Sequence, residues 1–270
     1  MMKLQRRSFV ALACAALPSA WAQGTGAAPW TPAELNLAIN MAGRQRMLSQ
    51  RVIKAWLAST MLPGHAAALK VLESSKSLFE KQLTDLSAKA PSQEIRSTYL
   101  SLAASWNDLQ SLLGSTTSTP DAVRTLIRAD ARVLSLAHQG TQQYEAVQNQ
   151  ATGALVNLAG RQRMLTQRMA KFYFTSAMGV DTDASMAELQ KARGEFEAAL
   201  ARLKAAPEAT PRILAELQLG ETQWVFFQHA LKRLDPGTPN KTYLSDVFVT
   251  SENLLQVMDK VTHLFASLEA

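Results

Sequence analysis

The sequence has 270 residues, of which one is cysteine (Cys14) and only 7% are aromatic. A single cysteine excludes an internal disulfide and a cysteine metal site. The four histidines show no His–x–x–x–His or Glu–x–x–His spacing for a metal. The sequence also lacks a Gly–x–Ser–x–Gly nucleophile motif and a glycine-rich phosphate loop. We therefore expect a protein that is not an enzyme and that has no metal and no cofactor.

Long apolar runs are also missing, and no segment approaches the roughly 20 apolar residues that span a bilayer. The N-terminus instead predicts an export signal, with a basic start, a short apolar stretch and an Ala–x–Ala site at residues 20–22. We predict that residues 1–22 are cleaved and that residues 23–31 form a linker. Arg6-Arg7 before Ser8-Phe9 favours the twin-arginine route, with a general secretory signal as the competing interpretation.

These features predict a periplasmic protein that does not span a membrane. The formal net charge is a modest +6, and an exported protein has little reason to bind nucleic acid. The overall charge therefore indicates no partner.

Leucine and alanine are abundant and β-branched runs are few, which favours helices. Thr31-Pro32-Ala33-Glu34 is a capping box with proline at the first helical position. Thr119-Pro120 and Thr210-Pro211 are further helix starts. The predicted helices cover residues 32–61, 65–89, 92–113, 120–150, 150–178, 183–205, 211–234 and 241–268.

One segment occurs twice: "AGRQRMLSQR" at residues 42–51 and "AGRQRMLTQR" at residues 159–168, 117 positions apart. "FEKQLTDL" and "FEAALARL" repeat at the same spacing, at residues 79–86 and 196–203. The sequence thus predicts an all-α fold of two tandem four-helix bundles, residues 32–148 and 149–270. No loop signal separates the fourth helix from the fifth, which leaves one long continuous helix as an alternative. End-to-end and side-by-side packing of the bundles both remain open.

Acidic residues are absent around both copies, between Glu34 and Glu73 and between Glu145 and Asp181. The helix that carries each copy nevertheless has three arginines and a lysine. At 100° per residue, Arg46 and Arg163 fall on an apolar stripe, each three positions after a glycine. That stripe comprises Gly43, Arg46 and Gln50 in the first copy and Gly160, Arg163 and Gln167 in the second. We expect Arg44, Arg51, Lys54 and Asn40 to face solvent.

A buried arginine needs a partner, because an unpaired buried charge costs about 3–5 kcal/mol. One interpretation is a structural brace to carboxylates of the following helix. The candidates are Glu73, Glu80 and Asp85, or Glu188, Glu195 and Glu197. A second is a bound anion, and a third is a docking surface. If the repeats pack about a pseudo-twofold axis, Arg46 and Arg163 face each other, and an anion between them would relieve their repulsion.

"INMAGRQRMLSQRVIK" and "VNLAGRQRMLTQRMAK" resemble the N-terminal ligand-binding domain of type IV pilus methyl-accepting chemotaxis transducers (PilJ-like). That domain is related to the periplasmic sensor domain of nitrate/nitrite sensor histidine kinases. The resemblance implies a site like the one in those kinases, where nitrate lies between the first helices of two subunits. One arginine from each subunit holds it, and these arginines correspond to Arg46 and Arg163.

We therefore expect a periplasmic sensor or binding protein for a small oxyanion, nitrate or nitrite foremost. The expected ligand-binding residues are Arg46, Arg163, Gly43, Gly160, Gln50 and Gln167. The chain shows no transmembrane or cytoplasmic signalling segment of the kind those families carry. We expect it to act on a membrane-bound sensor kinase, chemotaxis transducer or transporter. The alternative is a ligand-free helical interaction module that regulates a membrane sensor, transducer or pilus system.

Overall fold

A computed structural model describes residues 30–62, 64–115 and 118–268. These residues form eight helices and no strand. The helices are α1 (Pro32–Met61), α2 (Ala66–Ala88), α3 (Gln93–Ser115), α4 (Pro120–Gln148), α5 (Ala151–Ala177), α6 (Thr182–Lys204), α7 (Pro211–Leu231) and α8 (Lys241–Ala266). The predicted all-α class is confirmed, and each helix lies within a few residues of its predicted position. The predicted export signal lies outside the described residues.

The predicted helix starts are present. Thr31 accepts a hydrogen bond from the Glu34 main-chain N–H, and the Glu34 carboxylate accepts one from the Thr31 main-chain N–H at 2.8 Å. The Thr119 and Thr210 side chains also cap α4 and α7, each accepting a hydrogen bond from the main-chain N–H three residues later, and each is followed by proline. These caps satisfy main-chain donors that the first turn of a helix leaves without a partner.

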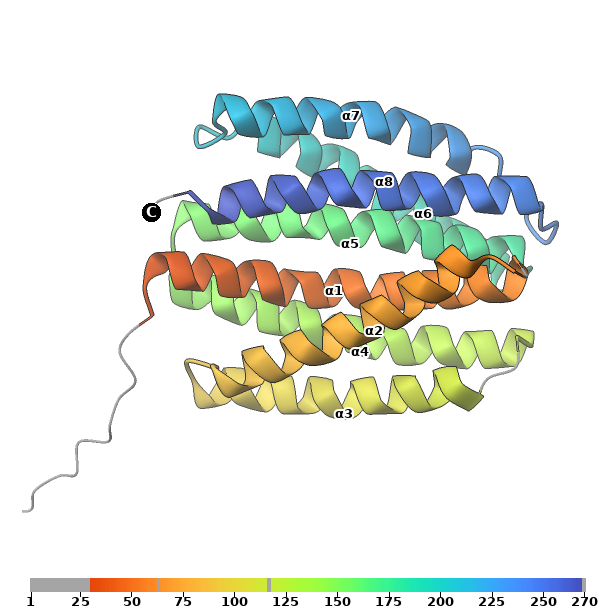
Figure 1. Ribbon diagram of the computed structural model, residues 1–270, viewed down its shortest axis with the longest axis horizontal. Coiled ribbons are helices and arrows are strands. Elements are labelled where there is room, and N and C mark those ends of the chain that lie inside the picture. The colour runs from red at the N-terminus through yellow and green to blue at the C-terminus, as the bar shows by residue number, and fades with distance from the viewer. Residues whose placement is uncertain (1–29, 63, 116–117, 269–270) are drawn as a thin grey trace, which may run out of the picture.

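The two predicted four-helix bundles, α1–α4 and α5–α8, lie side by side (Figure 1). Their main contact is between α1 and α5, which form the centre of the molecule. These two helices run parallel, and both are antiparallel to α8 (Figure 1). Contacts with α8 agree: Arg44 and Arg163 both reach Asp259, while Lys54 and Gln167 both reach Ser251.

The alternative of one continuous helix through residues 120–178 is wrong. Asn149 adopts a left-handed conformation (φ 48°) after the end of α4, and α5 begins at Ala151. Asparagine is among the few residues that enter this conformation readily. The chain therefore reverses here, and α5 returns beside α1 instead of extending α4 (Figure 1).

Equivalent aromatic pairs fill the two bundle cores. Phe79 and Trp106 stack with ring centroids 3.9 Å apart, and Phe196 and Trp224 lie 4.5 Å apart. Trp56 is also buried. No helix in the described ranges is long and apolar enough to cross a bilayer.

Helix α1 has almost no solvent-facing side between Leu35 and Ala58, because α2, α4, α5 and α8 all pack against it. The prediction that Lys54 and Asn40 face solvent is therefore wrong: both are buried. Arg44 and Arg51 are half-buried. The prediction assumed the polar face of a helix in one bundle, whereas a helix shared by two bundles has no such face.

Candidate functional site

The two repeated segments meet where Gly43 on α1 crosses Gly160 on α5. A Cβ placed on Gly43 would lie 4.0 Å from the Gly160 Cα, so the backbones approach closely. That Cβ would also lie 3.2 Å from Arg46 Nη2 and 3.6 Å from Arg163 Nη2. Both guanidinium groups thus converge on one crossing, and the glycines leave the space that they occupy.

Arg46 is buried, and its hydrogen-bond partners are neutral. Nη2 donates to the Asn157 side chain at 2.6 Å and to the Asn157 carbonyl at 3.3 Å. Nη1 lies 3.2 Å from His138 Nδ1. Because arginine has only donors, the histidine nitrogen accepts, which requires Nδ1 to be unprotonated. Asn157 in turn donates a hydrogen bond to the Glu145 carboxylate, so Asn157 links Arg46 to this carboxylate.

Arg163 occupies the equivalent position but has a carboxylate partner. Its Nη1 donates to Asp259 on α8, and its Nη2 donates to the Asn40 carbonyl at 3.1 Å. Asn40 is the counterpart of Asn157, so each arginine bonds the opposite repeat at the same position. The Nε atoms of both arginines are buried and have no hydrogen-bond partner. The predicted pseudo-twofold arrangement is therefore present, with different counter-charges on its two sides.

The electrostatics reflect this difference. Burial, and then the nearby charges of Arg161 and Arg163, lower the pKa of Arg46 to about 9. Burial also lowers the pKa of Arg163, but Asp259 opposes the effect and the pKa is about 10. Both guanidiniums are charged at neutral pH, and Arg46 is the less compensated. A site of this kind favours an anion.

Gln50 and Gln167 are buried one turn beyond the arginines and point toward the fourth helix of a bundle. Gln50 donates to both carboxylate oxygens of Asp130 on α4, at 2.9 and 3.0 Å. Gln167 donates to the Ser251 carbonyl on α8 at 3.2 Å. The structure thus brings Arg46, Arg163, Gly43 and Gly160 together. It directs the two glutamines elsewhere.

The interpretation that carboxylates of the following helix brace the buried arginines is wrong for both repeats, because Arg163 pairs with Asp259 on α8 and Arg46 has no carboxylate partner. In the second repeat, Glu195 and Glu188 instead pair with Arg161 and Arg168, both at 2.6 Å. In the first repeat, carboxylates of α8 serve the other cations. Arg51 and Lys54 pair with Glu252 on α8, and Arg44 pairs with Asp259 at 2.9 Å. The physical reason is that α8 covers α1, so its carboxylates reach these cations across the seam between the bundles.

The sequence analysis did not identify Asn40 and Asn157 as partners of the arginines, although both repeat at the 117-residue spacing beside the motif. Their repetition is a signal that could have found them. His138 and Asp259 lie in equivalent helices at a different spacing. Nothing in the local sequence connects them to the motif.

A pocket of about 280 Å³ lies beside Arg46, between α4, α5 and α6. Arg46, His138, Arg161 and Glu195 are among the residues that line it. Arg46 therefore borders a space that could hold a ligand.

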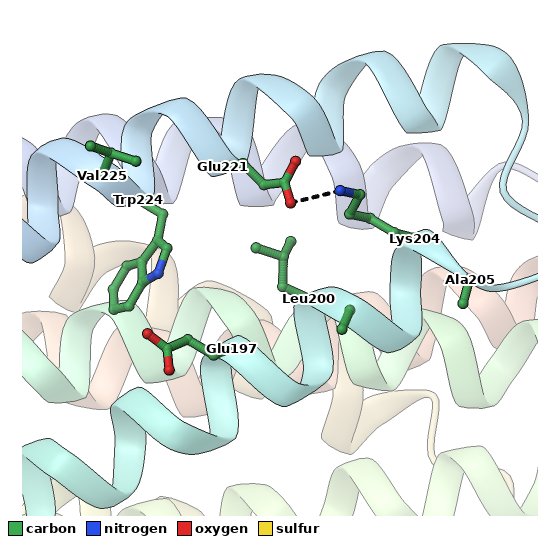
Figure 2. A pocket seen from close by; sticks show the side chains of 8 residues that line it. Glu197, Leu200, Lys204, Ala205, Glu221, Trp224 and Val225 are labelled. Atoms are coloured by element: carbon green, nitrogen blue, oxygen red, sulfur yellow. Dashed lines mark hydrogen bonds and ion pairs between the residues drawn. The ribbon is translucent and has the colours of Figure 1, made fainter.

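A larger, wider pocket of about 640 Å³ lies between α6 and α7 (Figure 2). Leu200 and Trp224 line it, and the Lys204–Glu221 ion pair at 2.7 Å bridges the two helices. No residue of the repeated motif lines this pocket, and its lining is mainly apolar. The pocket beside Arg46 is therefore the better candidate for an anion.

Comparison with known proteins agrees with the duplication. The family model described as "Type IV pili methyl-accepting chemotaxis transducer N-term" matches residues 30–131 and again residues 144–250. Searches of curated proteins and of solved structures gave no significant match. The two matched segments cover most of the chain and include both arginine motifs. The chain therefore belongs to the family of type IV pili methyl-accepting chemotaxis transducer N-terminal domains, a family of sensory modules, and contains two copies of that domain.

Proposed function

We propose that this protein is a periplasmic sensing and binding protein for a small oxyanion, nitrate or nitrite foremost, held by Arg46 and Arg163. The observation that carries the proposal is the convergence of two buried guanidiniums on one helix crossing, where Arg46 has only neutral hydrogen-bond partners. An anion at this position would supply the charge that Arg46 lacks. It would also offset the repulsion between the two arginines.

The expected affinity is modest because the ligand is small. Nitrate has four non-hydrogen atoms, and the best small ligands gain about 1.5 kcal/mol per atom, which sets a limit of about 6 kcal/mol. This corresponds to a Kd in the tens of micromolar, roughly. Such a value suits a sensor that reports a change in concentration instead of sequestering its ligand.

The signal would pass to a membrane-bound sensor kinase, chemotaxis transducer or transporter. The site lies at the contact between the two bundles, so ligand binding and bundle packing depend on the same α1–α5 seam. A partner that contacts both bundles would detect a change at that seam. Membership of a family of chemotaxis transducer domains supports a signalling role.

The test is calorimetry with nitrate and nitrite on the wild type and on Arg46→Gln and Arg163→Gln variants. We expect each substitution to weaken binding by about 10- to 100-fold, because a hydrogen bond to a charged group contributes about 1.5–3 kcal/mol. The matched control is Arg212→Gln, which removes one positive charge from an exposed position at the start of α7 and should leave binding unchanged.

Circular dichroism must show that the variants keep their helical content. An absence of both heat and thermal shift with nitrate, nitrite and related anions, on folded wild-type protein, would contradict the proposal. Equal binding by the wild type and Arg46→Gln would contradict the assigned position.

A ligand-free interaction module is a second candidate, favoured by the internal ion pairs. Arg44–Asp259, Lys54–Glu252 and Lys171–Asp130 join helices of the two bundles and act as braces. Under this alternative the arginines hold the bundles together without any ligand. The same calorimetry separates the two candidates.

A further inference from the structure

The duplication places two half-sites in one molecule, one on each side of the α1–α5 seam. Residues of α1 and α5 correspond at a spacing of 117, so Arg46 matches Arg163 and Arg44 matches Arg161. Helices α4 and α8 correspond at a spacing of 121, which pairs His138 with Asp259. The buried threonines support this register, since Thr141 and Thr262 each donate to the carbonyl four residues earlier at 2.7 Å.

The first half-site is closed by a carboxylate of the protein itself. Asp259 accepts hydrogen bonds from both Arg163 and Arg44, so one anionic group binds two guanidiniums. Arg44 and Arg163 come from opposite repeats, and Asp259 therefore bridges the seam. This arrangement shows which chemical group two arginines at this position accept.

The second half-site has the equivalent arginines, Arg46 and Arg161, but no such carboxylate between them. His138 stands in the place of Asp259 and contacts Arg46 as a neutral acceptor. Burial, and then the charges of Arg46 and Arg161, lower the pKa of His138, which keeps it uncharged at neutral pH. Arg161 pairs with Glu195. The first repeat has no equivalent of this pair for Arg44, because the counterpart of Glu195 is the apolar Leu78. Arg46 is left without an acidic partner.

The pocket beside Arg46 lies at this second half-site. Four basic side chains line it against one carboxylate, that of Glu195; the basic residues are Arg46, Arg161, Arg168 and Lys191. Arg168 is partly compensated by Glu188 at 2.6 Å. The remaining lining includes apolar side chains, namely Ala131, Leu134, Met164, Leu165 and Ala192. A pocket of about 280 Å³ is larger than a four-atom inorganic anion needs, and it offers both charge and apolar surface.

We propose that this pocket binds a small aliphatic monocarboxylate, whose head group takes the position that Asp259 holds in the other half-site. The proposal rests on the proposed function, since it uses Arg46 as an anion-binding residue and names the class of oxyanion. Arg46 and Arg161 bind the carboxylate, and the short hydrocarbon chain lies against Leu134 and Met164. Binding occurs once per molecule, because Asp259 already fills the equivalent position.

The first experiment is calorimetry on the full chain at low ionic strength with formate, acetate, propionate and butyrate, and with nitrate and nitrite in parallel. We expect one site per chain and an affinity that increases along the carboxylate series by about fourfold per methylene group, the gain from burying a CH₂. An affinity that is flat or that falls along the series would overturn the apolar part of the site.

The decisive variants are His138→Asp and His138→Asn. The two introduced side chains have nearly the same shape, but only aspartate carries a negative charge. His138→Asp supplies an internal carboxylate to Arg46 and should weaken carboxylate binding at least 30-fold, roughly the value of a charge-assisted hydrogen bond. His138→Asn remains neutral and should stay within about fivefold of the wild type. His229→Asp, at an exposed position on α7, adds the same charge elsewhere and should behave like the wild type.

The outcomes separate the two proposals. Binding of nitrate or nitrite without binding of carboxylates overturns the carboxylate inference and leaves the proposed function standing. Binding of no anion at all overturns both. Carboxylate binding that His138→Asp does not weaken overturns the assigned pocket, whereas selective loss in His138→Asp with retention in His138→Asn supports it.

Discussion

Two buried lysines show how single residues hold the bundles together. Lys54 on α1 pairs with Glu252 on α8 at 2.6 Å, and Lys171 on α5 pairs with Asp130 on α4 at 2.6 Å. Each lysine comes from the repeated motif, and each carboxylate belongs to the opposite bundle. Buried pairs of this kind need both members, because removing one leaves an uncompensated charge.

The contribution of the Lys54–Glu252 ion pair to stability can be measured at acid pH, where Glu252 becomes protonated. Burial alone would raise the pKa of Glu252, but Lys54 and Arg51 outweigh it and bring the pKa to about 2. A carboxylate whose pKa is lower in the folded state stabilises the fold fully above its unfolded pKa, about 4.5. That stabilisation is lost as the pH falls from there toward 2. We expect the free energy of unfolding in urea to decrease over this range.

The Glu252→Gln variant should lack this part of the acid dependence and should be less stable at pH 7 by about 3 kcal/mol. Glu73→Gln is the control, since Glu73 is an exposed carboxylate paired with Lys76 on the same helix. It should keep the acid dependence of the wild type. Identical pH profiles for wild type and Glu252→Gln would exclude the ion pair as a source of stability.

At the scale of elements, the close crossing of α1 and α5 depends on two glycines. An alanine at position 43 would place its Cβ against the movable Nη2 atoms of Arg46 and Arg163, and at ordinary contact distance from the Gly160 Cα. Alanine is also a better helix former than glycine by about 1 kcal/mol. We expect Gly43→Ala to change stability by less than about 1 kcal/mol.

The same substitution should weaken anion binding several-fold, because the Arg46 guanidinium must move to make room for the added methyl group. Thermal unfolding and calorimetry on one preparation measure the two effects. Gly194→Ala is the matched control, because Gly194 is a helical glycine with open space around it. A Gly43→Ala variant that binds the anion with wild-type affinity would show that anion binding does not depend on the α1–α5 crossing.

The helices themselves were predictable, because caps and prolines mark their starts locally. Thr31, Thr119 and Thr210 each cap the helix that the sequence predicts there. The turn at Asn149 could not be predicted, because no proline or paired turn residues mark it. Its left-handed conformation accompanies the packing of α5 against α1, which the local sequence does not reveal.

The site was predictable in part for a similar reason. Helical periodicity identifies Arg46 and Arg163 as buried, because both lie on one apolar face. Periodicity does not say which helix covers that face, so Asp259 and His138 could not be found from it. The burial of Lys54 was missed because it results from α8 of the other bundle.

At the scale of the molecule, the extensive α1–α5 contact should make the two bundles unfold together. Phe196 is fully buried in the second bundle, against Trp224. Phe196→Ala should cost about 3–5 kcal/mol and lower the unfolding midpoint by roughly 10 °C. Hydrogen exchange should show α1–α4 losing protection at the same lowered temperature. A first bundle that keeps its wild-type midpoint would show that the bundles are independent.

Because both domains lie in one chain, the residues on the two sides of the α1–α5 contact can differ in sequence. When two identical chains meet, the residues on either side of their axis are encoded by one codon and cannot differ. Here His138 and Asp259 are encoded separately. Asp259 pairs with Arg163 on one side, whereas a pocket lies beside Arg46 and His138 on the other. A duplication within one chain thus allows the two half-sites to diverge, so that one holds an internal ion pair while the other can change independently.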